Sequence, residues 1–406
     1  MRIADSNIKI KFADIFLLFS LFPYVSFNIT SFDTQPFTFL LGLIGLYFSQ
    51  LGFHLNKIFK ISLVLVLIAL FISAFSVIGG NYHVIRGMYN YLSIFFYLFV
   101  FSYLFRNNLI NNKLIIFANY TYLFFAFVQI YFPQIINMII VSRVNNSFYM
   151  GRGLSSLTPE PSHFGIILIL ISMLLFINSG YDFKKNIFLY LINLLAIFSL
   201  VRNAALILIL FVSFILAGLL NINYLLRLKY LRNLIILSLP LSFGIFYSIA
   251  YKTRIFRILD SIKFDDLQKT LIILINTDVS ISERLQHLII PFIALYKDLG
   301  MPHAFNGLEE YAASLGTELS IFAKVTNSKI FMSFMGDYVF SLGIFGLIAA
   351  FLIFIPLIKK KYVPNYILIL FVTLLTTSVP VSNPIVPAVI AGLYYKNNEL
   401  NQNCKM

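Results

Sequence analysis

Long apolar runs dominate the chain, and short polar segments separate them. A helix needs about 20 predominantly apolar residues to cross the hydrocarbon core of a bilayer. By this criterion we predict an all-α polytopic membrane protein with about 11–12 transmembrane helices. The spans are expected near residues 12–30, 36–55, 59–79, 88–105, 114–133, 162–179, 186–201, 203–221, 233–251, 337–358 and 364–380, and the twelfth segment, 384–395, contains two prolines.

The composition supports the same class. Hydrophobic residues make up 60% of the sequence and charged residues 11%, whereas soluble domains carry about 25% charged residues. We therefore treat residues 1–406 as a single integral membrane domain. The one cysteine, Cys404, excludes an intramolecular disulfide and a cysteine-based metal cluster. The five histidines form no HxxxH or HExxH pattern, so we expect no metal site and no cofactor.

The distribution of cations predicts the orientation. If the N-terminus lies in the cytoplasm, 17 of the 30 lysines and arginines fall in inner segments. Cytoplasmic loops of membrane proteins carry an excess of such residues. The net charge of +14 then reflects topology, and no basic soluble domain exists that would bind nucleic acid.

Two outer regions are longer than simple connections. One is the loop 134–161, and the other is the segment 252–335, which carries nine cations and nine acidic residues. Apolar spacing within 261–300 predicts helices that lie on the outer face of the membrane. Long ordered loops in compact proteins are usually functional.

The short outer loops contain arginine but no lysine, whereas the inner segments hold 4 arginines and 13 lysines. The outer arginines are Arg86, Arg143, Arg152 and Arg202. Guanidinium pairs with phosphate through two parallel hydrogen bonds, which ammonium does not. We therefore expect a phosphate-bearing ligand at the outer face. The alternatives are that these arginines extend to lipid headgroups, or that Arg202 merely forms the tip of a tight hairpin.

The stretch "GRGLSSLTPEPSHFG" at 151–165 places several ionisable groups where an apolar run begins. Thr158 as N-cap, Pro159 in the first turn and Glu160 near the positive helix end predict a helix start. His163 follows Glu160 by three residues, on the same helix face. Either the stretch is only a well-capped helix, or Glu160 joins the nearby arginine in a site.

Four stretches resemble motifs of the Wzy-type O-antigen polymerases, which belong to the O-antigen polymerase and ligase superfamily. The stretches are "RGLSSLTPEPSHFG", "SLVRNAALIL", "ISERLQHLIIPFIALYKDLGMPHAFNG" and "NSKIFMSFMGDYVFSLGIFGLI", and their order spans about residues 140–350. The ligases carry a histidine before the asparagine of the last motif. Here Thr326 precedes Asn327, which favours a polymerase.

The resemblance implies a metal-independent glycosyltransferase in the bacterial inner membrane, with its site facing the periplasm. Donor and acceptor would be polyprenyl-diphosphate-linked glycans, with membrane lipid and a chain-length regulator as further partners. Diphosphate would leave as arginine side chains stabilise its charge, and a general base would take the hydroxyl proton. The implied diphosphate ligands are Arg152, Arg202 and Arg284, with Arg86 and Arg143 as weaker candidates, and the implied bases are Glu160, His287 and His303.

Two other functions are kept as alternatives. One is an O-antigen ligase. The other is a flippase or transporter of lipid-linked oligosaccharides. Flippases tend to have short loops and cations deep within their spans, whereas these spans are almost free of charge. Many carriers also have inverted repeats, and no repeat is visible in this sequence.

Overall fold

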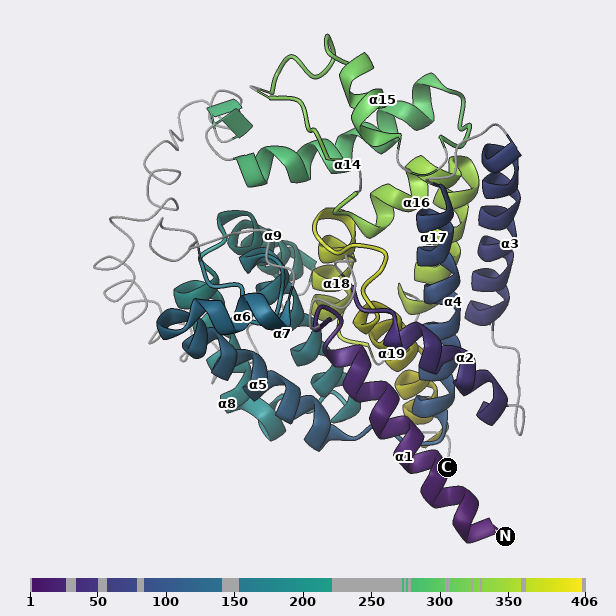
Figure 1. Cartoon of the computed structure of the whole chain (residues 1–406), viewed down its shortest axis with the longest axis vertical. Coiled ribbons are helices and arrows are strands. Elements are labelled where there is room, and N and C mark those ends of the chain that lie inside the picture. Colours follow the sequence, from purple (N-terminus) through teal and green to yellow (C-terminus); the bar gives the residue numbers. More distant parts are fainter. Residues whose placement is uncertain are drawn as a thin grey trace.

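The computed structural model describes most of the chain (Figure 1). The described residues are 2–26, 34–49, 57–78, 84–140, 153–220, 272–273, 275–276, 279–303, 305, 307–322, 324–328, 331–358 and 363–403. The regular structure in these ranges is helical and includes no β-strand, so the predicted all-α class is confirmed there. Four helical segments are long and apolar enough to cross a membrane: Gly87–Arg106, Asn112–Tyr131, Pro161–Asn178 and Phe183–Val201.

Most of the described helices overlap a predicted apolar run, but α1 ends at Leu21, whereas the first span was expected at 12–30. Those of the first half are α1 (Arg2–Leu21), α2 (Phe37–Ser49), α3 (Lys57–Ile78), α4 (Val84–Arg106), α5 (Asn112–Tyr131), α6 (Pro133–Ile139), α7 (Pro161–Asn178), α8 (Ile187–Ala196) and α9 (Ala204–Leu220). Those of the second half are α14 (Val279–Lys297), α15 (Leu308–Ser314), α16 (Phe334–Leu342), α17 (Ile344–Ile358), α18 (Asn365–Thr377) and α19 (Ile385–Asn403). Short helical turns, η2 (Phe183–Asn186) and η3 (Ile197–Val201), flank α8. The predicted span 233–251 lies outside the described residues.

Helix α7 forms the centre of the bundle. Of its residues Pro161–Asn178, 83% are buried inside the protein. It contacts α5, α8, α9 and α19. Helix α19 also packs along α4, which lies beside α3, and α3 contacts α17. Helices α14 and α15 lie across one end of the bundle (Figure 1). They belong to the predicted outer segment 252–335.

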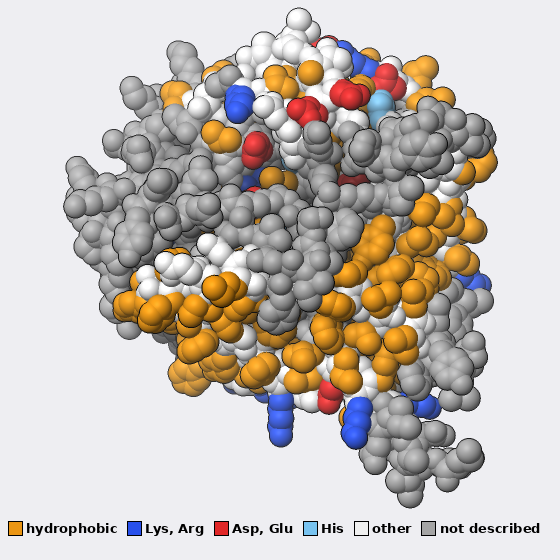
Figure 2. Space-filling view, viewed as in Figure 1, with side chains coloured by type: hydrophobic (Ala, Val, Ile, Leu, Met, Phe, Trp, Pro, Cys, Tyr) orange, Lys and Arg blue, Asp and Glu red, His pale blue; other side chains and the backbone are white. Residues whose placement is uncertain are grey.

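The surface has a broad apolar band. Figure 2 shows hydrophobic side chains across the middle of the molecule, with lysine and arginine below and mixed acidic, basic and histidine side chains above. Large apolar side chains such as Phe71, Phe124 and Phe188 are exposed in their helices. Soluble proteins rarely expose apolar patches of this extent, so a lipid bilayer is the environment that this surface fits.

A polar network joins three helices inside the bundle. The side-chain amides of Asn119 in α5 and Asn193 in α8 exchange two hydrogen bonds, of 2.9 and 2.8 Å. Asn193 also donates to the Ser172 hydroxyl of α7 at 2.8 Å. Interhelical hydrogen bonds of this kind stabilise helix association where no water competes.

The prediction of one continuous span at 337–358 was wrong. The helix breaks at Gly343, whose φ is +60°, so α16 ends at Leu342 and α17 begins at Ile344. A Cβ atom at position 343 would lie 2.2 Å from the carbonyl oxygen of Gly300. The Ile344 amide donates to that same oxygen at 2.9 Å. The break therefore lets the turn after α14 bind to the bundle, and hydropathy alone does not register one glycine within an apolar run.

Candidate functional site

The polar face of α14 is turned into the protein. Arg284 is only 7% exposed. Its Nε donates to the Ser378 hydroxyl at the end of α18 at 3.0 Å, and its Nη1 donates to the Ser280 carbonyl at 3.1 Å and to the Ser280 hydroxyl. A buried arginine retains its charge because guanidinium is the most basic group among protein side chains. Arg284 therefore places a fixed positive charge where α14 and α18 meet.

His287 lies one turn further along α14 and is fully buried. The Met332 amide donates to its Nδ1 at 3.0 Å, so Nδ1 carries a lone pair and Nε2 carries the proton. That Nε2 lies 3.3 Å from the hydroxyl of Thr326. Burial, with the nearby Arg284 charge, lowers the pKa of His287 to about 4. With both nitrogens bonded, His287 is suited to holding Thr326 and Met332 against α14 more than to accepting a substrate proton.

The start of α7 differs from the prediction by two residues. Glu160 is the N-cap and Pro161 opens the helix, whereas Thr158 and Pro159 were expected in these roles. The Thr158 hydroxyl instead bonds the carbonyls of Ser155 and Glu160, at 2.7 and 2.8 Å. Side chains at an N-cap lie at the positive end of the helix dipole, which stabilises an ionised carboxylate.

Glu283 joins Glu160 at this end of the bundle, although it precedes Arg284 in a distant part of the sequence. Burial raises the pKa of Glu283, and the Glu160 charge raises it further, while Arg284 and Lys324 lower it. The two carboxylates are thus within electrostatic reach of each other. Sequence analysis missed Glu283, and its one signal was its place beside Arg284 on an amphipathic segment.

The loop that leads to Glu160 is tied to α5 by one side chain. The side-chain Oε1 of Gln129 accepts hydrogen bonds from the backbone amides of Ser155 and Ser156, at 3.0 and 2.8 Å. Its Nε2 donates to the Ser155 hydroxyl at 2.9 Å. Both serines are fully buried. This clamp fixes the chain entering α7 and therefore fixes the position of Glu160.

The same loop contacts the turn that carries Arg202. The Leu154 amide donates to the Leu200 carbonyl at 2.8 Å. Arg202 ends η3 in the left-handed region, with φ 49°, and its Nε donates to the Ser199 carbonyl at 2.7 Å. Helix α9 begins two residues later, and its Ala205 packs against Ile281 of α14. Arg202 therefore lies in a turn that adjoins both the Glu160 loop and α14.

Gly153 makes this contact close, and its substitution tests the arrangement. A Cβ atom there would lie 1.7 Å from the Val201 carbonyl oxygen and 2.6 Å from that of Leu200. We expect Gly153→Ala to lower the free energy of unfolding by about 1–3 kcal/mol, the usual range for overpacking. The thermal unfolding midpoint in detergent measures this change. Gly316→Ala is the matched control, because its nearest neighbour would be an ordinary 3.6 Å away, and equal midpoints for the two variants would contradict the contact.

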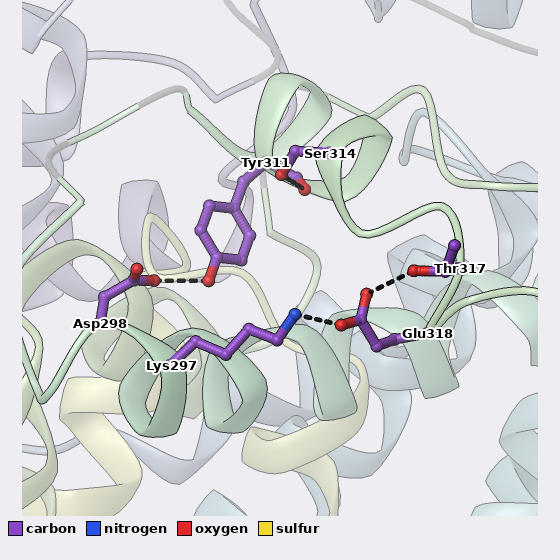
Figure 3. A network of polar contacts seen from close by, with 6 residues as sticks. All are labelled: Lys297, Asp298, Tyr311, Ser314, Thr317 and Glu318. Atoms are coloured by element: carbon purple, nitrogen blue, oxygen red, sulfur yellow. Dashed lines mark hydrogen bonds and ion pairs between the residues drawn. The ribbon is translucent and has the colours of Figure 1, made fainter.

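His303 belongs to a separate cluster at the other end of α14. Its Nε2 lies 2.8 Å from the Asp298 carboxylate, and its ring stacks on Phe340 at 4.7 Å. Figure 3 shows the Tyr311 hydroxyl pointing at the same carboxylate, beside the ion pair of Lys297 and Glu318. From Arg284 to Asp298 the helix rises about 20 Å. This distance separates His303 from Glu160 and Arg284. The packing therefore does not place His303 in the same site.

The side chains of three predicted arginines are not described by the structure. Arg143 and Arg152 lie outside the described residues, and Arg86 lies in the first turn of α4 with a side chain that is not described. The structure therefore places the turn of Arg202 beside the Glu160 loop and α14. It also adds Glu283, whose charge interacts with those of Glu160 and Arg284.

The candidate site contains both guanidinium groups and carboxylates. Guanidinium groups and the N-termini of α7 and α9 favour a bound anion. A carboxylate with a raised pKa suits proton transfer near neutral pH. Within the described ranges, no three histidine, cysteine, aspartate or glutamate side chains come together as metal ligands.

No family model, curated protein or solved structure matches the chain.

Proposed function

We propose that the chain is a polysaccharide polymerase of the kind that its four motifs resemble. It would transfer a glycan from polyprenyl diphosphate to a sugar hydroxyl of a second lipid-linked unit. One observation carries this proposal: the buried Arg284 of α14 is held against Ser378 at the end of α18, and Glu283 beside it lies within electrostatic reach of Glu160. A proton acceptor and a diphosphate ligand are the two groups that the reaction requires.

The proposed step is a displacement at the anomeric carbon of the donor. The acceptor hydroxyl oxygen forms a bond to that carbon, and the bond from the carbon to the phosphate oxygen breaks. The diphosphate departs with the electron pair, and the hydroxyl proton passes to Glu283, whose pKa is raised by burial and by the Glu160 charge. Arg284 and Arg202 stabilise the charge on the departing diphosphate.

The proposed setting is the bacterial inner membrane, with 11–12 spans and a cytoplasmic N-terminus. In this topology the lysine pair Lys184 and Lys185 follows α7 on the cytoplasmic side. Glu160 lies at the opposite end of the same helix. The segment 252–335 would then be periplasmic, which gives the site access to donor and acceptor in the outer leaflet.

Reporter fusions test this topology. A fusion after Lys185 is expected to report the cytoplasm, because lysine-rich short loops stay inside. A fusion after Gly300 is expected to report the periplasm. Paired alkaline phosphatase and green fluorescent protein fusions measure both sides, and a cytoplasmic signal at Gly300 would overturn the site assignment.

Chelation tests the proposed role of the arginines. We expect polymerisation in vitro to continue in EDTA, because guanidinium groups supply the positive charge beside the leaving diphosphate. Product length on a gel measures the reaction with and without chelator. Loss of activity that Mg²⁺ or Mn²⁺ restores would contradict the proposal and direct attention to carboxylates such as Asp265 and Asp266.

Deletion of the gene, followed by gel analysis of surface polysaccharide, separates the proposed function from its alternatives. A polymerase mutant keeps the core with one repeat unit and loses the ladder of longer chains. A ligase mutant loses even the single unit, and a flippase mutant retains the lipid-linked units inside the cell. Only the first pattern agrees with the proposal.

A further inference from the structure

Helix α14 exposes an apolar face. Ile289, Phe292 and Tyr296 follow one another at helical spacing, and all three side chains are exposed, Tyr296 at 85%. Leu299 and Met301 continue this surface in the following turn, with Leu299 at 91% exposure. At 100° per residue, Tyr296 points away from the side of the helix that carries His287. We call these five residues the α14 stripe.

The distribution of residues on α14 differs from that on a water-facing helix, because polar as well as apolar side chains are buried. Its buried side chains include Arg284, Gln286 and His287, whereas its most exposed side chains are large and apolar. A surface helix in water buries its apolar face and exposes its polar face. Exposed apolar patches mark contact with another apolar phase or partner.

The charged groups at this end of α14 are engaged on other sides of the helix. Lys297 pairs with Glu318, and the Asp298 carboxylate accepts a hydrogen bond from Tyr311 of α15 (Figure 3). Ile290 and Ala294 are buried against Leu308 and other apolar residues of the same layer. Helix α15 and the turn after it therefore cover the opposite side, and the α14 stripe remains apolar.

The end of the α14 stripe adjoins an exposed face of the bundle. Gly300, between Leu299 and Met301, accepts a hydrogen bond from the Ile344 amide at the start of α17. Ile344, Phe345, Ile348 and Phe351 are all exposed along α17, a helix without a charged residue. This surface belongs to the bundle that carries the apolar band, so the α14 stripe continues a face that lipid would cover.

From this continuity we propose that the α14 stripe docks into the outer leaflet of the bilayer in which the bundle is embedded. Helix α14 would then lie in the membrane interface, with its stripe at the boundary of headgroups and acyl chains, about 5–10 Å deep. Tyr296 fits this depth because tyrosine is enriched where membrane and water meet. The proposal concerns an interaction surface, and it holds whatever reaction the site performs.

Spin labels at single cysteines test the docking in lipid nanodiscs. Cys404→Ser removes the one native cysteine, and cysteines then replace Phe292, Tyr296 or Leu299 of the full chain. Collision with oxygen, which concentrates in lipid, is compared with collision with a water-soluble nickel chelate. Phe124 of α5 is the control for a lipid-facing position, and Ser314 of α15 is the control for an exposed position in water. We expect the ratio of oxygen to nickel collisions at the stripe to exceed that at Ser314 severalfold.

Two outcomes would overturn the proposal. Nickel accessibility equal to that at Ser314 would place the α14 stripe in water. Low accessibility to both reagents would show that a protein, either a second copy or another chain, covers the stripe. Because all three replaced side chains lie on the surface, each variant is expected to elute as a monodisperse peak, and this elution is checked before the spectra are compared.

Discussion

Arg284→Ala is expected to slow chain extension about 10²–10³-fold, the usual loss when one charge-assisted donor to the transition state is removed. Arg284→Lys should also impair extension, though less, because lysine keeps the charge but lacks the planar fork of donors. In the native protein Ser378 and Ser280 hold that fork in place. The length of the polysaccharide ladder, read beside an immunoblot of the membrane fraction, measures the effect.

Two controls separate chemistry from folding. Lys297→Ala removes an exposed cation from the far end of the same helix, and it should leave the ladder at full length. Ser378→Ala keeps the guanidinium and removes one partner, so we expect a smaller loss than in Arg284→Ala. Full-length ladders from both Arg284→Ala and Arg202→Ala would contradict the proposed diphosphate binding.

Glu283→Gln is expected to reduce the rate of extension by about 10²–10⁴-fold, the contribution typical of a general base. A base acts only when ionised, so the rate falls as the pH drops through its pKa. Burial and the Glu160 charge raise the pKa of Glu283. The acid limb of the pH profile should therefore lie above about 4.3, where an unperturbed glutamate titrates.

Glu160→Gln tests whether the Glu160 charge raises the pKa of Glu283. Loss of the Glu160 charge lowers the pKa of Glu283, so the acid limb should move to lower pH, with a shortened ladder at neutral pH. If Glu160 were only a charge at a helix end, its loss would cost about 0.3–1 kcal/mol, and both the ladder and the limb would stay nearly unchanged. Glu310→Gln, at an exposed position of α15, is the matched control.

The sequence pattern predicted the helices well because apolar runs report burial in a low-polarity environment. Helix α7 (Pro161–Asn178) lies within one residue of the expected span 162–179, although its start was expected at Pro159, and α4 covers the expected span 88–105. The pattern failed where one residue decides the backbone. Gly343 interrupts an apolar run without changing its hydropathy, and only its φ of +60° marks the break.

The candidate site was predicted less completely than the helices. Motif order identified Glu160, Arg202 and Arg284, because the resemblance compares residues within short stretches. The partnership of Arg284 with Ser378 and the coupling of Glu160 to Glu283 depend on contacts between distant segments. No local pattern contains such contacts. The same limit explains His287, whose bonds to Thr326 and Met332 leave its ring without a nitrogen for a substrate.

The break at Gly343 would couple the site to the thickness of the membrane. The Ile344 amide binds Gly300, and the His303 amide binds Phe340, so the turn after α14 moves with α16 and α17. A bilayer thinner or thicker than the apolar length of α17 displaces or tilts that helix, at a cost of fractions of a kcal/mol per ångström. The displacement would reach Arg284 along α14, which contains Pro291. Acyl-chain length would thereby adjust the spacing between Arg284 and the clamped Glu160.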